Sequence, residues 1–144
     1  MNSDKRIENV TIFFCWSVAA IATMGSLFFS EVMKFQPCVL CWYQRIAMYP
    51  LIVLFAIGFF QTAKSTIYFT LPIAVIGWVT ALYHNLLHYE IIPESASPCQ
   101  MGVSCSTVYI NWFGIITIPM LSLIAFTMIT IALVFLNRSV TNEK

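Results

Sequence analysis

The sequence predicts an all-α integral membrane protein: a bundle of four transmembrane helices in a single domain, with both termini cytoplasmic. Of its 144 residues, 60% are hydrophobic and only 9% are charged, whereas about a quarter of the residues in a soluble domain are charged. Four long apolar runs alternate with polar connections, and each run can supply the ~20 residues that cross a bilayer. The spans are expected at residues 10–29, 41–60, 67–87 and 112–136, and the cysteine-bearing connections at residues 30–40 and 88–111.

The first span, residues 10–29, contains no charged residue. A cleaved signal peptide is the alternative, with Lys5 and Arg6 as its basic start and a small-residue cleavage site at residues 20–22. The apolar run continues well beyond a normal signal-peptide core, which favours a membrane span. Cys15 lies inside this span and is interpreted as a small hydrophobic residue without a chemical role.

The second span has to include a cysteine pair. The uninterrupted apolar run at residues 46–60 is too short to cross a bilayer comfortably. It reaches spanning length only if the helix begins near Cys38 and Cys41 and takes in Arg45. These two cysteines are therefore expected at the first turn of a transmembrane helix, at the depth of the lipid headgroups. The aromatic residues 42–43 fit an interfacial belt at the same depth.

The third and fourth spans, residues 67–87 and 112–136, flank a long polar connection. It contains Cys99 and Cys105 among Pro, Ser, Gly and Gln residues, a composition typical of irregular structure. The second cysteine pair is therefore expected in a loop.

The number of spans and the distribution of basic residues predict the topology. With four spans, the termini share one side with the second connection, and the two cysteine-bearing connections share the other. Five of the seven Lys and Arg residues lie on the side of the termini, and only Lys34 and Arg45 lie on the cysteine side. Basic residues favour the cytoplasmic side. Both cysteine pairs are therefore expected in an extracytoplasmic, oxidising compartment.

The first cysteine pair has the features of a reactive site. On a helix, Cys38, Cys41 and Arg45 fall within an arc of about 60°, at about 100° per residue. Pro37 suits a helix start because its missing N–H would be unpaired there. The unpaired N–H groups and positive dipole of a helix start favour a thiolate, and Arg45 adds a permanent positive charge. In the alternative interpretation, Arg45 only extends to the lipid headgroups.

Two other interpretations of the cysteines stay open at this point. Cys-x-x-Cys also occurs in zinc sites, and a metal-binding membrane protein could use both cysteine pairs together with two histidines one helical turn apart, His84 and His88. The other possibility is a pair of inert structural disulfides. Cys-x-x-Cys at a helix start is, however, typical of redox proteins, and no resident metal is expected.

No basic patch or Gly-rich phosphate loop is visible, so no nucleic-acid partner is expected.

The run Gln-Pro-Cys-Val-Leu-Cys-Trp-Tyr-Gln-Arg at residues 36–45, followed by a span and then a Cys pair in the third connection, resembles the bacterial disulfide bond formation protein B (DsbB) family. The short Cys99-x5-Cys105 spacing is similar to the BdbC type rather than the enterobacterial form, whose second pair is much further apart. The resemblance covers essentially the whole chain, including Gly114 and the Ile118-Pro119 opening of the last span.

The resemblance implies a multi-pass bacterial plasma-membrane oxidoreductase that supports the folding of exported proteins. A reduced extracytoplasmic thioredoxin-like oxidase would attack the Cys99–Cys105 disulfide, with Cys99 as the expected site of the mixed disulfide. The resulting dithiol would then reduce Cys38–Cys41.

The resemblance also implies electron transfer to a membrane quinone, either menaquinone or ubiquinone. Cys41 would pass on the electrons as a thiolate, Arg45 would hold the quinone nearby, and Cys38 would resolve the adduct. Quinone reduction consumes protons, which His84 or His88 would supply. A vitamin K epoxide reductase-like protein is the related alternative, but there the active Cys-x-x-Cys follows the loop pair in the sequence, the reverse of the order here.

Overall fold

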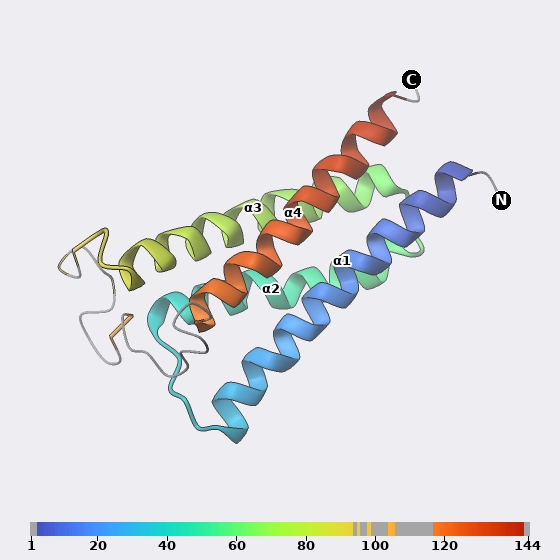
Figure 1. Ribbon diagram of the computed structural model, residues 1–144. Helices are drawn as coiled ribbons and strands as arrows, with labels where there is room; N and C mark the ends of the chain where they lie inside the picture. Colours follow the sequence, from blue (N-terminus) through green and yellow to red (C-terminus); the bar gives the residue numbers. More distant parts are fainter. Residues whose placement is uncertain (1–2, 94, 96–97, 99–103, 106–116, 143–144) are drawn as a thin grey trace.

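A computed structural model shows four long helices in the part of the chain that it describes (Figure 1). The structure describes residues 3–93, 95, 98, 104–105 and 117–142. The helices are α1 (Ser3–Leu27), continued by a π-helical turn η1 (Phe28–Val32), then α2 (Val39–Gly58), α3 (Ala63–His88) and α4 (Ile118–Asn142). Among the described residues, four helices are long and apolar enough to cross a membrane, and none of these residues forms a strand. The predicted all-α, four-span class is therefore confirmed.

The helices do not end where the apolar runs end. α1 begins at Ser3, within the polar head of the chain, and its π-helical turn continues past the first expected span to Val32. α3 begins at Ala63, where the side chain of Thr62 caps it by accepting a hydrogen bond from the Ser65 N–H. Polar residues can continue or cap a helix because its backbone hydrogen bonds do not depend on apolar side chains. Residues 112–116 of the expected fourth span lie outside the described residues.

Each helix of the bundle packs against two others. α3 lies between α2 and α4, and α1 also contacts both α2 and α4. The two ends of the described chain lie at one end of the bundle, together with the α2–α3 connection (Figure 1). The α1–α2 connection and the described parts of the α3–α4 connection lie at the opposite end. The fold therefore brings the two cysteine-bearing connections together.

The core contains large side chains from several helices that are fully buried, such as Leu51 and Phe55 of α2 and Phe126 of α4. The outward-facing surface is also apolar, with Phe60 90% exposed and Ile21 71% exposed. Water-exposed helices normally carry polar residues on this face. An apolar exterior around an apolar core is what a surrounding bilayer requires.

Small residues bring α3 close to its neighbours. Gly58 at the end of α2 lies against Thr66, where an added Cβ would come within 2.7 Å of the threonine methyl. Gly77 lies against the ring of Phe126 from α4 so closely that a Cβ would overlap it. Asn85 donates from Nδ2 to the carbonyl of Pro119 at 2.8 Å, which ties α3 to the first turn of α4. Of these contacts, the one from Asn85 lies at the cysteine end of α3 and holds that end against α4.

Candidate active site

Cys38 is the N-cap of α2. Its backbone is extended (φ −71°, ψ 170°), and its Sγ accepts a hydrogen bond from the Cys41 N–H at 3.4 Å. The sequence predicts the cysteine pair at the start of this helix, with Cys38 in the connection at residues 30–40, and it also predicts one helical stripe that joins Cys38 to Cys41 and Arg45. The structure agrees with the helix start but not with the helical stripe: Cys38 directly precedes the helix, and its extended N-cap backbone turns the side chain back over the first turn. The sulfur therefore occupies the position that a Ser or Asp oxygen takes in other helices.

Cys38 and Cys41 are in contact as free thiols. Their sulfur atoms lie 2.8 Å apart, and no disulfide joins them. Cys38 is buried, whereas Cys41 is partly exposed. The pKa of the Cys38 thiol lies well below its usual range, first because of the hydrogen bond with the Cys41 thiol and then because of His84, while burial opposes the shift. Cys38 is thus the sulfur of this pair that the N-cap and its neighbours favour as a thiolate.

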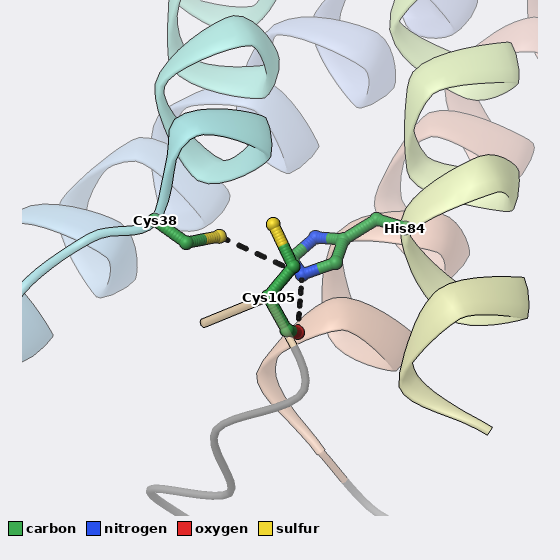
Figure 2. A group of neighbouring side chains, drawn as sticks. All are labelled: Cys38, His84 and Cys105. Carbon is green, nitrogen blue, oxygen red and sulfur yellow. Dashed lines mark hydrogen bonds between the residues drawn. The ribbon is translucent and has the colours of Figure 1, made fainter. Parts of the chain in front are cut away.

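His84 reaches Cys38 from α3. Its imidazole is 2% exposed, and its Nε2 lies 3.7 Å from Cys38 Sγ and 3.3 Å from the carbonyl oxygen of Cys105. Its Nδ1 lies 3.1 Å from the amide nitrogen of Gln44 on α2. Figure 2 shows Cys38, His84 and Cys105 converging from the start of α2, from α3 and from the α3–α4 connection. One imidazole therefore contacts both cysteine-bearing connections.

Cys105 brings the second cysteine pair to the site. It is 3% exposed and disulfide-bonded. Its Sγ, Cys38 Sγ and a ring nitrogen of His84 all lie within 4.8 Å of one another. Cys99, the other cysteine expected in this loop, lies outside the described residues.

Cys38, His84 and Cys105 are also the described residues that could bind a metal ion. Two thiolates and an imidazole are a donor set for zinc, and Cys38, His84 and Cys105 form such a group. His88, which the metal interpretation also used, does not belong to this group. The sulfur of Cys105 is engaged in a disulfide in this structure, and a metal ligand has to be a thiolate. Reduction would therefore have to come before metal binding.

Arg45 points away from the solvent and docks on α1. It is 9% exposed and donates from Nε to the hydroxyl of Ser26 at 2.8 Å and from Nη2 to the carbonyl of Ser26 at 2.9 Å. Its guanidinium also lies 5.4 Å from the centre of the Trp42 ring, within cation–π range. This geometry differs from the alternative in which Arg45 extends to the headgroups.

A cavity of about 540 Å³ lies beside the cysteines. Its walls are mostly apolar and come largely from α1, α2 and α4, and its polar lining includes Cys38, Cys41, Gln44, Arg45, His84 and His88. Three buried polar atoms of residues in its wall have no hydrogen-bond partner among the described residues: Thr23 Oγ1, His88 Nδ1 and Thr117 Oγ1. Buried polar groups normally have partners. The cavity thus suits a mostly apolar ligand with a few polar atoms.

Comparison with known proteins identifies the family. The sequence model described as "Disulfide bond formation protein DsbB" matches residues 8–136. The chain belongs to the DsbB family. It is 49% identical over 122 residues to disulfide bond formation protein C of Bacillus subtilis, a match that covers 85% of this chain and 88% of the relative. It is 47% identical over 133 residues to probable disulfide formation protein C 1 of Bacillus anthracis (92% and 93% covered). No solved structure matches the chain significantly.

Family membership indicates the general activity. A DsbB-family protein is a multi-pass membrane protein of disulfide bond formation, and the chain is accordingly an oxidoreductase. The expected resemblance, including its similarity to the type C proteins, is confirmed.

Two residues of the site were not predicted from the sequence, Gln44 and Ser26. Gln44 stands three residues after Cys41, so helical spacing alone could have placed it on the same face. Its contact with His84 joins residues 40 apart in the sequence, and no local pattern indicates it. Ser26 lies in an apolar span among other Ser and Thr residues, and nothing in the sequence distinguishes it as the partner of Arg45.

Proposed function

We propose that this DsbB-family protein reoxidises a thioredoxin-like disulfide oxidase outside the cytoplasm and passes the electrons to a membrane quinone, menaquinone or ubiquinone. The observation that carries the proposal is the approach of Cys38 to Cys105 beside the cavity lined by Cys41 and Arg45. Thiol–disulfide exchange proceeds by direct attack of a thiolate on a disulfide sulfur. A relay between two disulfides therefore needs one sulfur of each pair within reach of the other.

The proposed cycle begins when a thiolate of the reduced partner attacks Cys99 of a Cys99–Cys105 disulfide and releases the Cys105 thiolate. Cys105 then attacks Cys38 of an oxidised Cys38–Cys41 pair, which forms a Cys38–Cys105 bond and releases the Cys41 thiolate. The second thiol of the partner breaks the mixed disulfide and leaves Cys99 as a thiolate. Cys99 attacks Cys105 and releases Cys38. The partner has lost two electrons, and Cys38 and Cys41 have become a dithiol.

The electron acceptor fits the cavity beside this pair. Its apolar walls suit an isoprenoid quinone, and Arg45, Thr23, Thr117 and His88 provide donors and otherwise unpartnered polar atoms for the oxygens of the head group. A bound quinone supplies an acceptor for the two electrons and two protons that oxidation of the dithiol releases. Cys41, which is partly exposed at the cavity, would hand on the electrons. A partner with a potential near −120 mV requires such a strong acceptor.

The orientation in the membrane is part of the proposal. The end of the bundle at which the described chain begins and ends also carries the α2–α3 connection (Figure 1). The helix ends that meet there contain four of the six Lys and Arg residues that the structure describes. Under the positive-inside rule this end faces the cytoplasm. Both cysteine pairs then face outward, where disulfides persist.

The test replaces Cys41 with alanine in cells and traps the thiols of exported proteins. We expect a thioredoxin-like protein to accumulate in its reduced form, because the first cysteine pair can no longer form its disulfide. The matched control is Cys15→Ala, which removes a buried cysteine of α1 outside the site and should leave the partner oxidised. If every exported thioredoxin-like protein stays oxidised in the Cys41→Ala cells, the proposed function is wrong.

Peptide mapping of purified protein in which Cys41 and Cys99 are both replaced by alanine tests the relay itself. With both of these sulfurs removed, mild oxidation should join the two remaining site cysteines as a Cys38–Cys105 disulfide that no neighbouring thiol resolves, because their sulfurs lie within 4.8 Å of each other. A Cys38 that stays unpaired would contradict the relay. A tightly held, stoichiometric metal ion that is lost in Cys38→Ala protein would instead favour the metal-binding alternative.

A further inference from the structure

We propose that His84 is the positioning residue for exchange between the two cysteine pairs. In this arrangement, one proton on its Nε2 is shared by Cys38 Sγ and the Cys105 carbonyl oxygen, and Gln44 keeps the proton on that nitrogen. The inference deepens the proposed function and rests on it, since exchange between the pairs is the step that His84 serves. It assigns His84 to the cysteines, whereas the sequence suggested a proton donor to quinone.

The contacts of the imidazole determine where its proton lies. A carbonyl oxygen can only accept a hydrogen bond, so the contact from Nε2 to the Cys105 carbonyl at 3.3 Å requires hydrogen on Nε2. In a neutral ring Nδ1 is then a bare acceptor. The Gln44 amide nitrogen, 3.1 Å away, is a donor placed to satisfy it. A single neutral tautomer thus satisfies every contact, and the other tautomer would place a lone pair against the carbonyl oxygen.

The burial of these four residues makes the position of the His84 proton important for stability. His84 is 2% exposed, Cys105 3%, Cys38 6% and Gln44 7%, so water does not replace a contact that is lost. A buried polar group that is left without a hydrogen-bond partner destabilises the protein. Gln44 therefore imposes the tautomer that presents Nε2–H to the two cysteines.

The shared proton serves the exchange in two ways. By binding the backbone of Cys105, His84 holds the loop sulfur close to Cys38, and fixed proximity raises the rate of an intramolecular step. When Cys99 attacks Cys105 and the Cys38–Cys105 bond breaks, the electron pair goes to Cys38. Nε2–H then donates to the thiolate that leaves. Exchange is faster when the leaving sulfur is stabilised as a thiolate.

The other ionisable groups around Cys38 come from α2, α3 and the α3–α4 connection. The cavity is lined by Cys41, Arg45 and Tyr49 of α2, His88 of α3 and Cys105 of the connection, and Tyr83 of α3 packs against the buried cluster that contains Cys38. The parts of α1 and α4 that line it contribute no acidic, basic, cysteine or tyrosine side chain. A pH-dependent change at Cys38 in a His84 variant can therefore be assigned to His84, provided that these residues are kept.

The first test is alkylation of the reduced, full-length protein with iodoacetamide as a function of pH, with the modification of Cys38 resolved by mass spectrometry. His84→Ala should raise the pH midpoint of Cys38 alkylation by about one unit, a tenfold loss of thiolate at a given pH. His84→Gln, whose amide nitrogen can take the place of Nε2, should restore part of the shift. Gln44→Leu should raise the midpoint less, and Gln61→Leu, an exposed glutamine just beyond the far end of α2, not at all.

A double variant separates positioning from general damage. If Gln44 acts through His84, Gln44→Leu should cause no further shift in the His84→Ala protein, because coupled residues are not additive. An unchanged midpoint in His84→Ala, or fully additive shifts, would overturn the inference. This assay uses neither partner nor quinone. If Cys38 alkylation is unaffected while Cys41→Ala cells accumulate reduced partner, only the role of His84 is wrong.

A measurement on the unmodified protein covers the case in which His84→Ala does not fold. The chain has two histidines, so a ¹⁵N-histidine spectrum resolves both rings. We expect hydrogen on Nε2 of His84, which the contact with the Cys105 carbonyl oxygen requires. Hydrogen on Nδ1 alone would refute the inference.

Discussion

Replacing Ser26 with alanine should remove half of the hydrogen bonding that holds Arg45 on α1. Arg45 donates from Nε to the Ser26 hydroxyl at 2.8 Å and from Nη2 to the Ser26 carbonyl at 2.9 Å, and alanine removes only the first acceptor. A hydrogen bond to a charged group contributes about 1.5–3 kcal/mol, and Arg45 is too buried for water to replace it fully. For a chain of this length, the loss corresponds to a decrease in melting temperature of about 4–12 °C.

The assay is thermal unfolding of purified protein in detergent, together with the dependence of turnover on quinone concentration. Ser17→Ala is the matched control on α1, because its hydroxyl donates only to the Phe13 carbonyl of its own helix. We expect Ser26→Ala to raise the KM for quinone more than it lowers kcat, because Arg45 is displaced while the cysteines stay in place.

An Arg45→Met background completes the test. Methionine keeps the apolar stem and removes every donor, so Ser26→Ala should then have little further effect on the melting temperature. If Ser26→Ala melts like Ser17→Ala, or loses as much stability without Arg45 as with it, the docking of Arg45 on Ser26 does not stabilise the fold.

The rate of Cys38 alkylation in the reduced protein should change less than about threefold between pH 8 and pH 6, because the hydrogen bond with Cys41 lowers the pKa of Cys38 and its thiolate persists. The alkylation rate of an ordinary thiol would fall about 100-fold over this range. Such a fall at Cys38 would contradict the lowered pKa. Gly77→Ala should destabilise the protein by about 1–3 kcal/mol, because its Cβ would overlap Phe126, whereas Gly25→Ala meets no atom within 4 Å and should be neutral or stabilising. Equal melting temperatures for the two glycine variants would argue against the α3–α4 packing. Alkaline phosphatase should be inactive when fused after the C-terminus and active when inserted in the α3–α4 connection, and the reverse pattern would invert the proposed orientation.

The sequence was sufficient for the class of fold because a bilayer imposes one simple requirement. Each span needs a long run without charge, and the gaps between such runs are visible in the chain. The exact helix ends were less predictable. α1 begins at Ser3, in the polar head, since neither a helical hydrogen bond nor a cap requires an apolar side chain.

The site was predictable as far as local spacing carries information. Pro37 and the Cys-x-x-Cys spacing placed the first pair at a helix start, and parity placed the second pair at the same end of the bundle. Contacts across helices were not predictable. Gln44 meets His84, and Arg45 meets Ser26, only because α2 packs against both α3 and α1.

Cys38 is the residue at which the two halves of the relay meet. Its sulfur lies 2.8 Å from Cys41 Sγ and within 4.8 Å of Cys105 Sγ, so it can form a disulfide with either after a small movement. The N-cap position and His84 stabilise its thiolate, which makes Cys38 a good leaving group when Cys99 attacks Cys105. In the proposed cycle, direction comes from the removal of electrons at Cys41, beside the cavity and Arg45.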